Sequence, residues 1–223
     1  MTLRMIKTDW LAIKSCRWRL PVMAATVAVF GFLKLTMTII PISAYMAIAF
    51  SVNAFAVEEK GKLDHLYLSL PLSRKSIVRG RFAFMILLLT VALIVCGAIT
   101  VITAPTLEFG AFAVEIEPEI IVLMCFLGFA FGGFINLSMY PVMFRMGYAK
   151  GKIFGYYIPV GIMSAVFGAI GSLATSRFEL FSGWLTYWFE NPLMVCAIMF
   201  AIGAGLFFIS YQLSLRLYNK RDL

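Results

Sequence analysis

Long runs without a charged residue set the strongest constraint on how this chain can fold. Five runs hold 23 to 25 residues each: 35–57, 82–104, 120–144, 153–176 and 191–215. At 1.5 Å per residue, a helix of that length crosses a bilayer core of about 30 Å. Backbone groups in hydrocarbon must be satisfied within the segment, so each run is predicted to be a helix. Only 13% of the residues are charged, which indicates a membrane protein.

A sixth uncharged run, Leu20 to Leu33, has only 14 residues, whereas a crossing needs about 20. Arg19 and Lys34 flank this run, and their long side chains can extend to opposite interfaces. A re-entrant segment is the alternative to a crossing. We favour a crossing because of the topology that the basic residues indicate.

Seventeen of the 19 Lys and Arg residues fall in segments on one predicted side of the membrane: 1–19, 58–81, 145–152 and 216–223. The other side has only Lys34 and Arg177. The positive-inside rule therefore places both termini in the cytoplasm, with 105–119 and 177–190 facing outward. Two cytoplasmic termini require an even number of crossings. We predict an all-α, polytopic membrane protein with six transmembrane helices, N-in and C-in, as a single domain over residues 1–223.

Residues 1–19 predict a helix that lies on the membrane surface. Apolar residues from Leu3 to Ile13 recur at spacings of three and four, and basic residues occupy the opposite face. Trp10 and Trp18 suit the headgroup region. The segment is therefore interpreted as an interfacial helix on the cytoplasmic leaflet.

Residues 58–81 form the longest charged segment and carry six basic residues. Pro71 followed by Ser73 indicates a helix start, because a Ser hydroxyl can accept from the free N–H groups of a first turn. We expect a short basic helix over Ser73–Arg79, lying across the ends of two membrane helices. That geometry suits docking to a separate cytosolic protein.

The residues Glu58-Glu59-Lys60 and the run from Ser69 to Val78 resemble the loop between the second and third helices of ABC-2 type transporter permeases. The similarity is greatest to a small six-span bacterial group that includes the permease subunits of phenol-soluble modulin exporters. In that family the N-terminal segment is an elbow helix, and this loop carries a coupling helix that contacts the ATPase.

The resemblance assigns two sets of candidate residues. The ATPase-coupling set is Leu72, Ser73, Arg74, Lys75, Ile77, Val78 and Arg79. The coupling-loop motif is Glu58, Glu59, Lys60 and Asp64. We expect Leu72, Ile77 and Val78 to offer an apolar contact and the basic residues to supply charge. The alternative is a solvated basic loop that only fixes topology.

No catalytic or metal constellation is expected. His65 is the only histidine, and the four cysteines, Cys16, Cys96, Cys125 and Cys196, have no ligand spacing. The run Gly147 to Ile153 has three residues between its first glycines instead of four, so it fails the Walker pattern. We therefore expect a transport subunit rather than an enzyme, with ATP and Mg²⁺ bound by a separate ATPase.

Small residues recur four apart at Gly128 and Gly132, and again at Gly147, Gly151 and Gly155. Such spacing lets helix backbones approach closely in lipid. Packing within one subunit and packing across a dimer interface are both consistent with it.

The resemblance implies the permease subunit of an ATP-driven exporter in a bacterial cytoplasmic membrane. Such a subunit would dimerise with itself or a similar permease and work with two ATPase subunits. The subfamily implies amphipathic peptides or peptide antibiotics as cargo; import instead of export stays open. The net charge of +8 follows the membrane topology rather than indicating nucleic acid. The alternative functions are a secondary transporter or channel, disfavoured because the predicted spans lack charged residues, and a membrane sensor or assembly scaffold.

Overall fold

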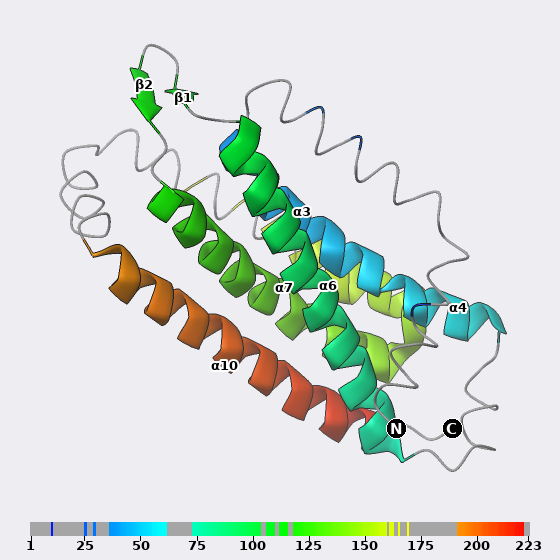
Figure 1. Cartoon of the computed structure of the whole chain (residues 1–223). Helices are drawn as coiled ribbons and strands as arrows, with labels where there is room; N and C mark the ends of the chain where they lie inside the picture. Colours follow the sequence, from blue (N-terminus) through cyan, green and yellow to red (C-terminus); the bar gives the residue numbers. More distant parts are fainter. Residues whose placement is uncertain are drawn as a thin grey trace.

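The computed structural model of the chain is a bundle of long helices with a small two-stranded hairpin at one end (Figure 1). The structure describes residues 36–61, 73–103, 106–109, 112–115, 118–159, 161, 162, 165, 169 and 191–220, with the single residues Trp10, Ala25 and Val29. The predicted interfacial helix 1–19, the short run 20–33 and the loop 177–190 lie outside the described residues, those single residues apart. So do Asp64, His65 and Leu72.

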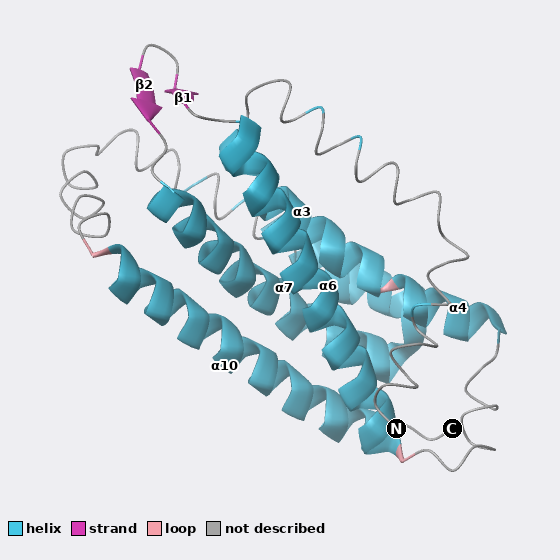
Figure 2. Cartoon of the chain, in the orientation of Figure 1, coloured by secondary structure: helices cyan, strands magenta, loops and turns pink. Residues whose placement is uncertain are grey.

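Helices dominate the described part of the chain (Figure 2). They are α3 (Thr36–Ser51), α4 (Asn53–Gly61), α6 (Arg74–Thr103), α7 (Pro118–Lys152), the short π-helix η1 (Ile153–Tyr157) and α10 (Pro192–Asn219). The exception to the predicted all-α class is an antiparallel pair within the predicted loop 105–119. Its strands are β1 (Thr106–Phe109) and β2 (Phe112–Glu115), with Thr106 opposite Glu115 and Phe109 opposite Phe112.

The described residues contain four helices long and apolar enough to cross a membrane: 40–61, 74–102, 119–155 and 192–219. They coincide with four of the predicted runs, so the multi-span helical architecture is confirmed. The count of six and the orientation of the termini stay predictions.

The core lies where α3, α6 and α7 meet. Gly128 and Gly132 of α7 face this contact. A Cβ added to Gly128 would lie 2.9 Å from the Leu93 side chain, and one added to Gly132 would lie 2.8 Å from the Leu89 side chain. Side chains of the neighbouring helices therefore fill the space that a Cβ would need at these two positions. Because lipid is as apolar as the core, such close van der Waals packing is what favours association here. The predicted packing role of this glycine pair is confirmed within one chain.

Helices α7 and α10 run side by side over most of their length. Phe126 stacks edge-on against Phe200 near one end, and Phe144 against Tyr218 near the other. Between these two contacts, the Asn136 side-chain amide donates to Ser210 Oγ at 3.2 Å. The Ser210 hydroxyl in turn donates to the backbone carbonyl of Asn136 at 3.0 Å. Hydrogen bonds at membrane depth fix the register of two apolar helices.

Helix α7 contains a reversal at Gly147, whose φ of 77° and ψ of −176° interrupt the helical geometry. Gly151 packs on Met143, and Gly155 packs on Met139. In a straight helix, residues sixteen apart would be about 24 Å apart, so the chain must fold back on itself. The predicted connection over 145–152 is therefore a turn at one glycine between two helical arms rather than a loop, and the second arm leads into the predicted run 153–176.

Candidate functional site

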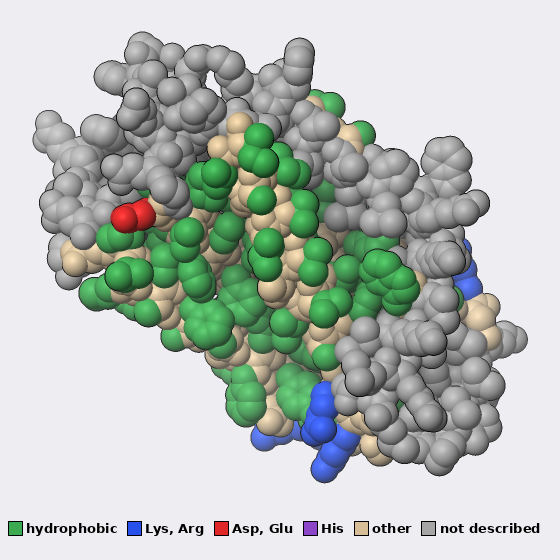
Figure 3. Space-filling view, viewed as in Figure 1, with side chains coloured by type: hydrophobic (Ala, Val, Ile, Leu, Met, Phe, Trp, Pro, Cys, Tyr) green, Lys and Arg blue, Asp and Glu red, His purple; other side chains and the backbone are tan. Residues whose placement is uncertain are grey.

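Basic side chains gather at one end of the bundle, which we call the basic end. It is formed by α4, the first turns of α6, the Gly147 turn and the last turn of α10. Its exposed cations are Lys60, Lys75, Arg79, Arg145, Lys150, Arg216 and Lys220. Figure 3 shows Lys and Arg near one end of the visible face and an acidic group toward the other.

The start of α6 differs from the expected short helix lying across the bundle. Ser73 caps it as predicted, with its Oγ accepting from the Ser76 N–H at 3.2 Å. From Arg74, however, the helix runs unbroken to Thr103. The predicted docking segment is therefore the start of a long helix, because nothing after the cap interrupts its helical geometry.

Because of the helical period, the residues of the predicted ATPase-coupling set lie on two different faces of α6. Ile77 and Val78 are 3% and 0% exposed, inside the core. They are therefore unavailable as the exposed apolar contact that we expected. Lys75 and Arg79, one turn apart, are exposed. Of the predicted docking residues, these two offer a free basic surface.

Arg74 connects the start of α6 to the end of α10 by hydrogen bonds. Its Nη1 donates to the carbonyl oxygens of Asn219 at 3.1 Å and Tyr218 at 3.4 Å. Its guanidinium lies 6.0 Å from the centre of the Tyr218 ring. The last carbonyls of a helix lack intrahelical donors and carry partial negative charge, so a cation here is favourable.

Glu58 and Arg81 form an ion pair between α4 and α6, with 2.5 Å between Glu58 Oε2 and Arg81 Nη2. Their side chains are 12% and 2% exposed. The guanidinium also lies 4.1 Å from the centre of the Phe55 ring, a cation–π geometry. Removing one partner of such a buried pair costs about 3–5 kcal/mol, because it leaves the other charge uncompensated.

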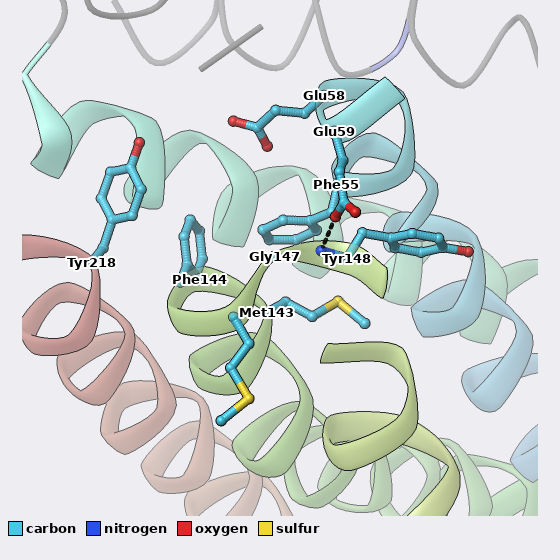
Figure 4. A pocket seen from close by; sticks show the side chains of 9 residues that line it. Phe55, Glu58, Glu59, Met143, Phe144, Gly147, Tyr148 and Tyr218 are labelled. Carbon is cyan, nitrogen blue, oxygen red and sulfur yellow. Dashed lines mark hydrogen bonds between the residues drawn. The ribbon is translucent and has the colours of Figure 1, made fainter. Parts of the chain in front are cut away.

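Glu59 reaches the turn of α7 instead. Its Oε2 accepts from the backbone N–H of Tyr148 (Figure 4). It also accepts from the backbone N–H of Ala149 at 3.1 Å. These amides open the helical arm after Gly147, so they lack intrahelical acceptors. A carboxylate at a helix N-terminus also complements the helix dipole. Glu58 therefore contacts α6, and the adjacent Glu59 contacts α7.

A cavity of about 240 Å³ lies between α4, the Gly147 turn and α10. Its lining is mainly aromatic and sulfur-containing, with two carboxylates: Phe55, Glu58, Glu59, Met143, Phe144, Met146, Gly147, Tyr148 and Tyr218 (Figure 4). In the described part of the chain, no group of three His, Cys, Asp or Glu residues could hold a metal ion. The contacts of Glu58, Glu59 and Arg74 at this site join α4 to α6, α4 to α7, and α6 to α10.

A family model described as ABC-2 family transporter protein matches residues 4–219. The chain belongs to the ABC-2 transporter family. Comparison with curated proteins gives no match. Permeases of the ABC-2 family are membrane subunits of ABC transporters and generally work with ABC ATPase partners. The chain is accordingly a multi-pass membrane protein.

In this ABC-2 family member, described residues of the two predicted sets lie at the basic end. Glu58, Glu59 and Lys60 fall in the last turn of α4, while Ser73 precedes α6 and Arg74 and Lys75 begin it. The sequence also pointed to Gly147 and Arg81, but only as a packing glycine and a topology-setting cation. Tyr148 and Tyr218 were missed, since a backbone amide and a helix C-terminus have no sequence signature as partners.

Proposed function

We propose that this chain is the membrane-spanning permease subunit of an ATP-driven ABC exporter in a bacterial cytoplasmic membrane. Both termini and the basic end face the cytoplasm. The cargo is an amphipathic peptide or peptide antibiotic, as the similarity to modulin-exporter permeases implies. The chain pairs with a second copy or a similar permease, and a separate ATPase binds and hydrolyses MgATP.

One observation carries this proposal. At the start of α6, Lys75 and Arg79 are exposed on a Ser73-capped helix that continues directly into a membrane span. An ATPase that binds these side chains would act on a rigid lever of 30 residues rather than on a flexible loop. In a family whose members work with ATPases, this surface is the best-supported docking point among the described residues.

Co-purification tests the docking surface. The tagged chain is co-expressed with candidate ABC ATPases from the same genome, and ATP hydrolysis is measured in the co-eluting fraction. We expect Lys75→Glu combined with Arg79→Glu to lower ATPase recovery about ten-fold or more, since reversing two charges adds repulsion to the lost contacts. Full recovery with the double variant would show that the ATPase binds elsewhere.

Arg216→Glu combined with Lys220→Glu is the matched control. Both residues are exposed at the basic end, Arg216 in the last turn of α10 and Lys220 directly after it, so this pair makes the same change in charge. We expect it to retain the ATPase. An equal loss in both double variants would mean that overall charge, and not the α6 surface, governs binding.

Transport into inside-out vesicles tests the cargo and the direction. We expect ATP-dependent uptake of a fluorescent amphipathic helical peptide, and no uptake of a scrambled peptide of equal composition without an amphipathic face. Equal uptake of both peptides would contradict the proposed cargo class. Uptake only into right-side-out vesicles would reverse the direction.

A further inference from the structure

Glu59 joins two parts of the chain that are about 90 residues apart in sequence. The carboxylate is exposed at the end of α4, and the amides that it binds belong to Tyr148 and Ala149. Phe55 of α4 also packs on Tyr140 and Phe144 in the first arm of α7. Glu59 is the α4 residue that hydrogen-bonds the backbone just after the Gly147 turn.

The position of the α7 turn affects both of the helical arms that it joins. Gly147 adopts a left-handed φ of 77°, and an added Cβ would lie 3.1 Å from Glu59 Oε2. Beyond the turn, Gly151 and Gly155 place the second arm directly against the backbone of the first. With no side chain between them at these points, a displacement of the turn shifts both arms together.

Helix α4 is also fixed to the docking helix α6. The buried Glu58–Arg81 pair, backed by Phe55, makes this connection. Glu58 and Glu59 are adjacent, so α4 holds α6 with one carboxylate and the α7 turn with the next. The buried pair resists separation, whereas the exposed contact is the weaker one.

We propose that Glu59 is the positioning residue that transmits movement of the α6 docking surface to the Gly147 hairpin. The route runs from α6 through Arg81 and Glu58 to α4, and from Glu59 to the amides of Tyr148 and Ala149. Its role in transport rests on the proposed function. Its physical basis, the dependence of the turn on α4, is independent of any ATPase.

Hydrogen exchange on the purified chain in lipid nanodiscs tests that basis. We expect Glu59→Ala to speed exchange at the Tyr148 and Ala149 amides about five-fold or more, as for the loss of a helix cap. Lys60→Pro should do the same, because proline forces residue 59 out of helical geometry and withdraws its carboxylate. Lys60→Ala should leave exchange unchanged.

Unchanged exchange in Glu59→Ala would overturn the contact. Unchanged exchange in Lys60→Pro would overturn the transmission, since the turn would then not depend on the geometry of α4. Either result stands even if no ATPase binds the wild-type chain, so the inference and the proposed function fail separately.

The coupling between ATP use and transport tests the functional role in the complete complex. We expect Glu59→Ala to keep ATPase recovery while lowering peptide transported per ATP about five-fold or more, and Glu59→Asp to recover part of the ratio. Arg145→Gln, an exposed neighbour of the turn, should match wild type. An unchanged ratio in Glu59→Ala would overturn the role of Glu59 in coupling.

Discussion

At the residue scale, the backbone of Gly147 is what allows α7 to reverse. Its left-handed φ is unfavourable for any residue with a Cβ, and the carboxylate of Glu59 occupies the space beside it. We expect Gly147→Ala to lower the free energy of unfolding by about 1–2 kcal/mol. Thermal unfolding in nanodiscs measures this. Gly161→Ala is the control, since no atom beyond its own stretch of helix lies within 4 Å of its Cβ position. Equal unfolding midpoints of the two variants would contradict the predicted backbone strain at Gly147.

The Glu58–Arg81 pair makes a second prediction at this scale. We expect Arg81→Met to lower the free energy of unfolding by about 3–5 kcal/mol, because the partly buried carboxylate of Glu58 would lose its countercharge. Adding Glu58→Gln should restore part of that loss by removing the stranded charge. Unfolding midpoints of the single and double variants measure it. Additive losses would indicate that the two side chains act independently.

At the scale of elements, the contact between α7 and α10 depends on a glycine. A Cβ on Gly203 would lie 2.6 Å from the ring of Phe129 and 3.1 Å from the backbone of Ala130. We expect Gly203→Ala to destabilise the chain by about 1–3 kcal/mol through overpacking. Gly205→Ala on the same helix meets no atom within 4 Å, so it should be neutral or stabilising. Equal stabilities would show that α10 shifts freely against α7.

At the scale of the whole molecule, the basic end and the β1–β2 hairpin lie at opposite ends of the bundle (Figure 1). The excess of basic residues predicts that the hairpin faces outward. In a cysteine-free background, a cysteine replacing Glu115 should react with an impermeant reagent on intact cells, and one replacing Lys220 only after lysis. The reverse labelling would invert the topology.

The sequence alone determined the helical membrane class, the position of four spans, the capping role of Ser73 and the residues that gather at the basic end. These features depend on local physics: the length of an uncharged run, the hydroxyl before a first turn and the distribution of Lys and Arg. Such signals lie within a few residues of the structure that they specify.

Only the tertiary structure decided the partners at the site. The helical period of Ser73–Arg79 places Ile77 and Val78 close together on α6, but only the packing of the neighbouring helices makes their side of the helix the buried one. Glu59 could equally have bound a cation; it binds two backbone amides because the Gly147 reversal brings them beside α4. Contacts between residues about 90 positions apart arise from packing between helices, and no local pattern encodes them.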